Sequence, residues 1–394
     1  MTLPDFDEVI DRTGTHCSKW DDMEAGFGVS PAEGGLAMWV ADMDFRPPAA
    51  VQRAVEAAAA HGIYGYPGAN PAYQQSICWW MANRHDWTVD PDWILTAAGL
   101  VNGTAMAVQA FTQPGDGVIV MSPVYHAFGR IIKANNRNLV ELPLAQDEGS
   151  YRLDWSRWET MLDGSERMMI LCSPHNPGGR VWTAEELRQV ADFCVRHDLI
   201  LISDEIHNDL VMPGHKHHVM AALVPEISDR LITLSAATKT FNIAGAHLGN
   251  AIIADADLRL RFKAALMAGG VSPAFIGAEM VTAAYSPEGA AWVDSLVDYL
   301  DGNRRLFDEG VYAIPGLRSM PLQATYLSWV DFSGTGMTPA EFTARVERGA
   351  KIAANHGKSF GAGGDSFLRF NIATPRARVA QAVQRLQEAF SDLQ

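Results

Sequence analysis

Four short apolar runs, each followed at once by polar residues, constrain the fold of this chain more than any other feature of its sequence. They cover residues 118–121, 168–172, 199–203 and 231–234, and amphipathic, helix-like stretches separate them. Apolar strands that alternate with helices are typical of a parallel sheet covered by helices. In open sheets of this kind, ligands bind at the carboxyl edge of the strands. We therefore expect the polar residues after the four runs to converge on one site.

Two of these polar residues need a special environment. Asp204 follows the third run, and a buried carboxylate requires a strong partner, although an aspartate here could also simply cap a helix. Lys239 follows the fourth run, at the mouth of a predicted core. Burial and nearby cations lower the pKa of an amine and make it a nucleophile toward an aldehyde. Asp204 and Lys239 are thus candidate catalytic residues.

Three other segments give weaker signals. Tyr125 offers a flat ring for stacking, or it packs as an ordinary core aromatic. Asn176 could donate a hydrogen bond to a ligand, or it could serve the turn that its Asn-Pro-Gly sequence favours. Gly99, Leu100 and Val101 open a predicted helix, and the backbone amides at a helix N-terminus can hold a phosphate.

The pattern along the chain predicts two domains and an arm. From about residue 94, strands and helices alternate, which predicts a three-layer α/β domain with a mostly parallel sheet between helices. After residue 273 the pattern changes to long helices with strand-like runs at 325–330 and 367–371, which predicts a smaller α+β domain. The predicted segments are an N-terminal arm that packs on the small domain (1–46), the large domain (47–285) and the small C-terminal domain (286–394).

Composition and charge argue against several classes of partner. The net charge of −15 disfavours binding to nucleic acid or to an anionic membrane. The four cysteines form no C-x-x-C pair, the N-terminus lacks the features of a signal peptide, and no apolar run approaches the ~20 residues that span a bilayer. We therefore expect a cytoplasmic protein. The histidine-rich segment 215–218 lacks the ligand spacing of a metal site and is interpreted as a solvated loop, so no metal is expected.

Seven motifs in this chain resemble, in their order, the class I/II aminotransferase family of fold-type I enzymes, which use pyridoxal 5′-phosphate (PLP). Within that family, the chain is most similar to the cystathionine β-lyase (C–S lyase) branch of the MalY/PatB type. The motifs are 38–45 (MWVADMDF), 64–67 (YGYP), 122–126 (SPVYH), 173–177 (SPHNP), 203–207 (SDEIH), 238–242 (TKTFN) and 371–375 (NIATP).

The resemblance implies a role for each residue of the candidate site. Lys239 would carry PLP and act as the general base, and Asp204 would pair with the pyridine nitrogen. Tyr125 would stack on the ring, and Asn176 would donate a hydrogen bond to its phenolic oxygen. Arg369 matches the arginine that binds the α-carboxylate of the substrate, a bidentate contact for which lysine is a poor substitute.

The resemblance also implies how the phosphate of PLP is bound. Segment 99–101 and Thr238 would contact it, and Tyr64 would reach it from the neighbouring subunit, which implies a homodimer with shared active sites. Two positions depart from the family pattern. Where many aminotransferases carry a serine and an arginine on the phosphate, this chain has Ala236 and His247.

The segments that contain Asp42 and His207 favour the lyase branch. Many aminotransferases have a tyrosine in place of His207, and we expect His207 to lie near the phenolic oxygen of PLP. The expected reaction cleaves cystathionine or a related S-substituted cysteine to a thiol, pyruvate and ammonia. Two alternatives stay open: an aminotransferase, which shares the cofactor site, and a regulatory protein that binds a protein partner through the same fold. Because the family pattern begins within the first 20 residues, no DNA-binding module is expected before it.

Overall fold

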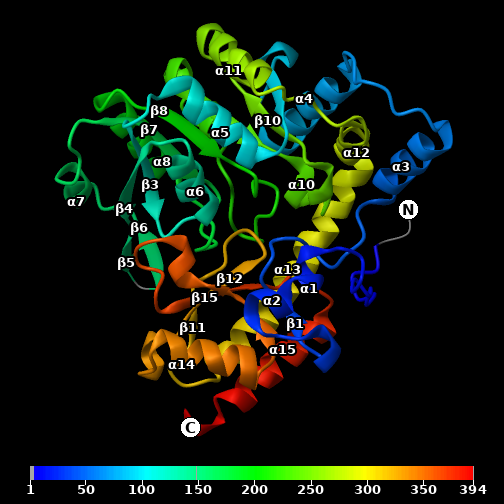
Figure 1. The fold of residues 1–394 in the computed structure, drawn as a ribbon, viewed down its shortest axis with the longest axis vertical. Helices are drawn as coiled ribbons and strands as arrows, with labels where there is room; N and C mark the ends of the chain where they lie inside the picture. Colours follow the sequence, from blue (N-terminus) through cyan, green and yellow to red (C-terminus); the bar gives the residue numbers. More distant parts are fainter. Residues whose placement is uncertain (1–3, 148, 394) are drawn as a thin grey trace.

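The computed structural model describes residues 4–147 and 149–393, so residues 1–3, 148 and 394 of the predicted segments lie outside the described residues. Most of the chain surrounds a seven-stranded sheet with the strand order β2-β10-β9-β8-β7-β3-β4, and only β10 runs antiparallel to its neighbours (Figure 1). The predicted mostly parallel sheet is confirmed. The strands are β2 (Ile94–Ala97), β3 (Gly117–Ser122), β4 (Asn138–Pro143), β7 (Glu166–Cys172), β8 (Ile200–Asp204), β9 (Leu231–Ser235) and β10 (Gly249–Ile252).

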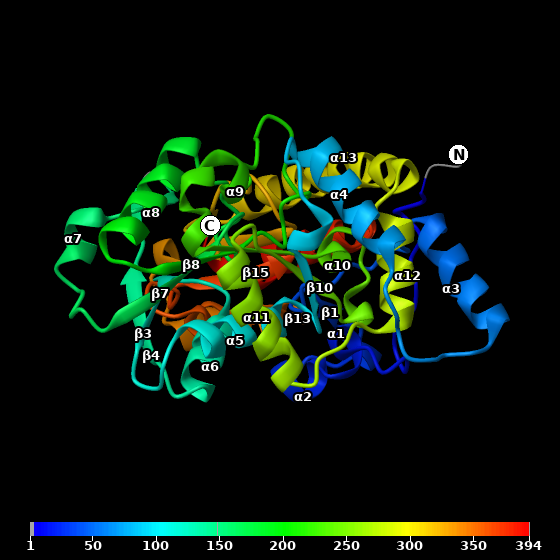
Figure 2. The ribbon, with the colours of Figure 1, turned by 90° about the horizontal axis from the view of Figure 1, so that it is seen from above.

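Helices cover both faces of this sheet, as Figure 2 shows from above. Val118 and Val120 of β3 pack in a core with α5 and α6, whereas Ile119 and Met121 pack with α8 on the opposite face. Successive strand residues point to opposite faces, so burial of both faces produces the continuous apolar runs of the sequence. The helices are α3 (Ala49–His61), α4 (Pro71–His85), α5 (Leu100–Phe111), α6 (His126–Ala134), α7 (Trp155–Glu159), α8 (Ala184–Arg196), α9 (Met220–Leu223), α10 (Ala237–Thr240), α11 (Ala256–Ala268) and α12 (Phe275–Ala284).

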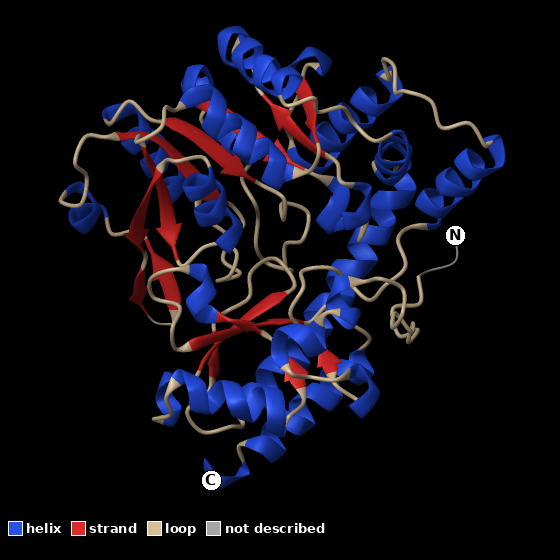
Figure 3. Cartoon of the chain, viewed as in Figure 1, coloured by secondary structure: helices blue, strands red, loops and turns tan. Residues whose placement is uncertain are grey.

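A second, antiparallel sheet has the order β11-β12-β15-β14, and Figure 3 shows its strands apart from the large sheet. The N-terminal segment joins this part of the molecule, because β1 pairs in parallel with β13. The exact limits of the arm and the two domains stay predictions. The elements are α1 (Ser18–Asp21), α2 (Met23–Phe27), β1 (Leu36–Ala37), α13 (Pro287–Tyr312), β11 (Arg318–Ser319), β12 (Leu327–Asp331), α14 (Pro339–Ala344), β13 (Ile352–Ala353), β14 (Asn355–His356), β15 (Phe367–Asn371) and α15 (Arg376–Ala389), besides the β5–β6 hairpin (Ala145–Asp147, Ser150–Arg152).

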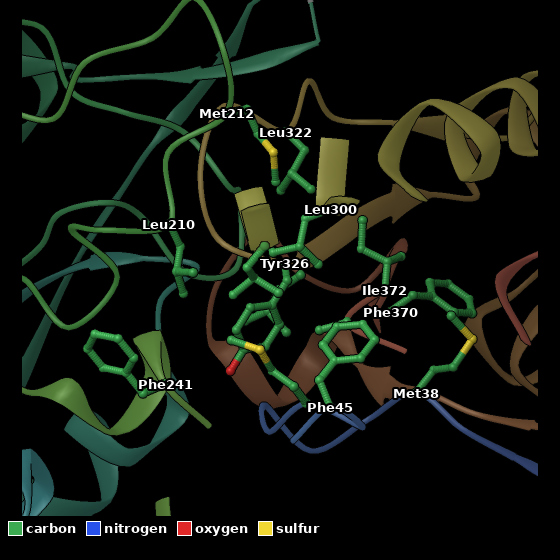
Figure 4. Close-up of a cluster of buried hydrophobic side chains, with 14 of the residues drawn as sticks. Met38, Phe45, Leu210, Met212, Phe241, Leu300, Leu322, Tyr326, Phe370 and Ile372 are labelled. Atoms are coloured by element: carbon green, nitrogen blue, oxygen red, sulfur yellow. The ribbon is translucent and has the colours of Figure 1, made fainter. Parts of the chain in front are cut away.

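A large apolar cluster connects the two sheets. Figure 4 shows Met38 and Phe45 of the N-terminal segment beside Tyr326 and Phe370. Phe241 lies at the edge of the drawn cluster, and all five side chains are buried. The N-terminal segment is therefore part of the core between the two sheets. Among the described helices, none is long and apolar enough to cross a membrane.

Candidate active site

A cavity of about 440 Å³ lies at the carboxyl edge of the parallel strands, where the second sheet and the N-terminal segment face the large sheet. The polar residues after the apolar runs do converge here. Every predicted site residue except Tyr64 lines this cavity, although the role of each one stays a prediction. The residues that the structure brings together are Gly99, Leu100, Val101, Tyr125, Asn176, Asp204, His207, Thr238, Lys239 and Arg369.

Lys239 lies in the short helix α10, which follows β9 directly. Its Nζ donates a hydrogen bond to the carbonyl oxygen of Ala41 at 2.5 Å. Burial lowers the pKa of Lys239 to about 8; the positive charge of Arg369 acts in the same direction, while Asp42 and Asp204 oppose the shift. A much larger share of the amine is therefore uncharged and nucleophilic near neutral pH than for an ordinary lysine.

Asp204 is the last residue of β8, and it is only 5% exposed. Its Oδ1 accepts a hydrogen bond from the backbone N–H of Ile206 at 3.1 Å. Burial raises the pKa of Asp204 to about 7, with Glu205 acting in the same direction and Lys239 opposing it. No cationic side chain of the described residues lies in ion-pair contact with this carboxylate, so a cationic group in the cavity would complete its environment.

Arg369 comes from β15 and is 2% exposed. Its guanidinium donates to three neutral oxygens: Asn176 Oδ1 at 3.0 Å, the carbonyl of Trp39 at 2.8 Å and Asn355 Oδ1 at 2.6 Å. Its Nε has no hydrogen-bond partner in the described structure. Burial lowers the pKa of Arg369 to about 10. The guanidinium is thus a buried cation that an anionic ligand would neutralise. Because Oδ1 of Asn176 accepts from Arg369, its amide nitrogen remains the group available to a ligand.

His207 and Tyr125 complete the polar lining near these groups. His207 is 2% exposed, its Nδ1 has no partner among the described residues, and its ring meets that of Tyr326 edge-on at 6.1 Å. Burial lowers the pKa of His207 to about 3, so the imidazole is neutral at physiological pH. Tyr125 precedes α6, and burial raises the pKa of its phenol, which is therefore protonated.

The N-terminus of α5 forms another part of the cavity wall. Gly99 precedes this helix with φ 85° and ψ 164°, a conformation that glycine adopts without strain. The first backbone amides of a helix have no partner within it and attract anions. Thr238 lies in the cavity wall as well. Of the two departures from the family pattern, His247 lines the cavity, while Ala236 is buried and offers no hydroxyl group.

Tyr64 is the one predicted site residue that the structure does not bring to the cavity. It lies between α3 and α4, in a segment that projects from the body of the molecule (Figures 1 and 2). Its side chain is 62% exposed, and that of Tyr66 is fully exposed. Tyr64 therefore contributes nothing to the cavity of its own chain.

Sequence reasoning missed several cavity residues. Residues 39–41 belong to the motif at 38–45 but were not predicted to line the site, and no role was predicted for His126 or Asn355. Asn371 holds segment 39–41 in place by donating hydrogen bonds to the carbonyls of Val40 and Asp42. The only signal in the sequence was the motif itself, since contacts between residues more than 300 positions apart leave no local pattern.

The interpretation of segment 215–218 as a solvated loop is wrong for His217. This residue is 8% exposed, and its Nε2 lies 2.9 Å from Oε2 of the buried Glu205. The cause is a tertiary contact that local composition cannot reveal. His215 and Lys216 are exposed. In the part of the chain that the structure describes, no group of three or more His, Cys, Asp or Glu residues is arranged to hold a metal ion.

Comparison with known proteins agrees with the resemblance seen in the sequence. Residues 40–386 match the family model described as aminotransferase class I and II. The cystathionine β-lyase PatB of Bacillus subtilis (strain 168) is 39% identical over 98% of this chain and 100% of its own length. Cystalysin from Treponema denticola, whose crystal structure contains PLP, is 34% identical over 100% of both chains, with a TM-score of 0.95. The PLP-bound C–S lyase from Staphylococcus hominis is 27% identical over 98% of both chains, with a TM-score of 0.89.

Proposed function

The chain belongs to the class I and II aminotransferase family, and from that premise we propose that it is a PLP-dependent carbon–sulfur β-lyase. Its substrate class is cystathionine or a related S-substituted cysteine, and its products are a thiol, pyruvate and ammonia. The likeness to PatB and to the C–S lyase of S. hominis supports this activity. The observation that carries the PLP-dependent chemistry is one cavity with three complementary groups, the amine of Lys239, the carboxylate of Asp204 and the guanidinium of Arg369, while the likeness to lyases favours carbon–sulfur cleavage.

The chemistry of the cavity fits PLP. Asp204 is a carboxylate whose pKa is raised by burial, and a protonated pyridine nitrogen would stabilise its charged form. Lys239 supplies the amine that binds the aldehyde, and the amide nitrogen of Asn176 would donate to the phenolic oxygen. The ring of Tyr125 would stack on the pyridine ring. His207 would lie near the phenolic oxygen.

The phosphate of PLP would lie at the N-terminus of α5, where the backbone amides of Gly99, Leu100 and Val101 attract an anion. Thr238, which also lines the cavity, would add a hydroxyl group. His247 lines the cavity where many family members carry an arginine. An imidazole has fewer hydrogen-bond donors than a guanidinium and cannot bind a phosphate through a fork of N–H groups, so we expect the helix N-terminus to contribute a larger share of phosphate binding here.

The residues of the cavity divide the work of the reaction. Arg369 binds the α-carboxylate of the substrate and so fixes the amino acid in the cavity. The uncharged amine of Lys239 removes the α-proton, and its lowered pKa suits a base that works near neutral pH. When bound, PLP supplies an electron-poor ring that delocalises the electron pair left on the α-carbon. The carbon–sulfur bond at the β-carbon then breaks, and the sulfur leaves as a thiolate. Hydrolysis of the remaining three-carbon fragment consumes one water and gives pyruvate and ammonia.

We further propose that the enzyme works as a homodimer in the cytoplasm. The exposed Tyr64 lies outside its own cavity, which supports a role at the phosphate of the other subunit. All four cysteines, which lie within the described residues, are free thiols, as expected in a reducing compartment.

One assay distinguishes this function from that of an aminotransferase, which would use the same residues to pass the amino group to a keto acid. Purified, PLP-loaded protein is incubated with L-cystathionine in the absence of any keto acid, and pyruvate and thiol are followed together. Equal amounts of both products support the lyase. Conversion of the amino acid only after a keto acid is added would contradict the lyase and favour the aminotransferase.

A further inference from the structure

Two buried carboxylates lie on the segment that carries Asp204 and His207, yet neither lines the cavity. These are Glu205, which is 1% exposed, and Asp209, which is 7% exposed. A buried carboxylate is costly unless several donors satisfy it. The structure satisfies both, but it connects them to different parts of the molecule.

Asp209 connects this segment to the helix that carries Lys239. Its Oδ2 accepts a hydrogen bond from Thr240 Oγ1 at 2.8 Å, and Thr240 follows Lys239 directly in α10. Its Oδ1 accepts from Trp80 Nε1 at 3.0 Å and lies 2.8 Å from His85 Nε2, both in α4. Burial acts to raise the pKa of Asp209, but the hydrogen bonds and charges around it outweigh this and lower the pKa, so the carboxylate is ionised.

Glu205 anchors the same segment without touching α10. Its Oε1 accepts from Ser203 Oγ at 2.8 Å and from the backbone N–H of Met220 at 3.0 Å. Its Oε2 lies 2.9 Å from Nε2 of the buried His217. Glu205 therefore fixes the segment to the chain around residue 220, while Asp209 fixes it to α10 and α4.

Apolar side chains next to Asp209 and Thr240 are buried in the same region of the core. Leu210 and Phe241, the residues after Asp209 and Thr240, are both fully buried members of the apolar cluster drawn in Figure 4. The ring of Trp80 meets that of Phe241 edge-on at 5.3 Å and stacks on that of Tyr285 at 4.8 Å. Trp80, which donates to Asp209, is therefore itself held in the core beside Phe241 and Tyr285.

We propose that Asp209 is a positioning residue that sets the place of Lys239 relative to Asp204 and His207. The Thr240–Asp209 hydrogen bond is a direct polar link between α10 and the segment after β8. Both sides of the cavity are thereby connected to one buried carboxylate, which Trp80 and His85 of α4 also contact. This inference rests on the proposed function, because it assumes that Lys239 carries PLP.

The test compares two buried hydroxyl groups whose carboxylate partners hold different parts of the molecule. Thr240 and Ser203 are both 0% exposed, and each donates to a buried carboxylate at 2.8 Å. Thr240→Val removes the hydroxyl that reaches Asp209, and Ser203→Ala removes the hydroxyl that reaches Glu205. We expect only Thr240→Val to lower the fraction of bound PLP that borohydride fixes on Lys239, as measured by mass spectrometry. It should also lower kcat by about ten- to a hundredfold, the range expected for a misplaced catalytic group, with KM changed by less than about twofold.

Three further variants complete the design. Thr240→Ser keeps the hydroxyl and should restore the attached fraction and kcat. Asp209→Ala should reproduce the effect of Thr240→Val, whereas Glu205→Ala should lower the thermal midpoint without lowering the attached fraction. Equal behaviour of Thr240→Val and Ser203→Ala, or wild-type behaviour of both Thr240→Val and Asp209→Ala, would overturn the positioning role. A wild-type protein with no PLP on Lys239 would instead refute the proposed function.

Discussion

Replacement of Arg369 by alanine tests how this cavity selects amino acids. The guanidinium is 2% exposed, donates to three neutral oxygens and leaves Nε without a partner in the described structure. None of the ion pairs among the described residues includes Arg369, so its charge is uncompensated until an anion enters the cavity. An α-carboxylate is such an anion, and the substrate brings it.

The size of the effect follows from this geometry. A hydrogen bond between two charged groups contributes about 1.5–3 kcal/mol. Arg369→Ala should therefore lower kcat/KM for L-cystathionine by roughly 10- to 150-fold, since each 1.4 kcal/mol is a factor of ten. The variant should retain PLP, because of the residues that we assign to the cofactor only Asn176 is hydrogen-bonded to Arg369. Removal of a buried, uncompensated charge stabilises the fold, and this offsets part of the stability that is lost with the packing of the Arg369 side chain.

Steady-state pyruvate formation over a range of L-cystathionine concentrations measures the effect, and the visible absorbance of the purified protein reports bound PLP. Arg180→Ala is a matched control, because Arg180 is also largely buried but is paired with Glu186 at 2.7 Å, outside the cavity. This control should lower thermal stability and leave kcat/KM near that of the wild type. An unchanged kcat/KM for Arg369→Ala, or an equal loss in both variants, would refute the carboxylate-binding role.

Three other predictions concern the cofactor site. Borohydride reduction and peptide mapping of the purified protein should place a pyridoxyl group on Lys239, and a label on any other lysine would contradict the assigned site. The pKa of Asp204, about 7 against an ordinary value of 3.8, means that the PLP-free folded protein binds more protons than the unfolded chain between these values and loses stability as the pH rises through them. Asp204→Asn should thus raise the free energy of unfolding of PLP-free protein at pH 7 by at most about 4 kcal/mol and have little effect at pH 4. If thermal unfolding shows the same change in stability at both pH values, the raised pKa of Asp204 would be contradicted. Mixing inactive Tyr64→Asp and Lys239→Ala proteins should restore roughly a quarter of wild-type activity, because about half of the re-formed dimers carry one intact site; activity no greater than the sum of the parents after verified subunit exchange would exclude a shared site.

Local sequence patterns predicted the strands of the large sheet, because both faces of that sheet are buried. The runs that became β3, β7, β8 and β9 are continuously apolar because helices cover both faces of the sheet. The start of α8 is also encoded locally, because Thr183 and Glu186 form a capping box within one turn of chain. A sheet of known direction then places the residues after each strand along one edge, which is why Asp204 and Lys239 could be assigned to one site.

The sequence by itself thus determined the parallel sheet, the residues at its carboxyl edge and the family to which the motifs point. Tertiary structure alone decided which groups meet across hundreds of residues, such as the Lys239 amine and the Ala41 carbonyl, or Arg369 and Asn176. It also decided that His217 is buried on Glu205 and that Tyr64 lies outside its own cavity. The physical reason is that periodicity and capping act over a few residues, whereas desolvation, and with it the pKa of Asp204 and Lys239, depends on every element that packs around the site.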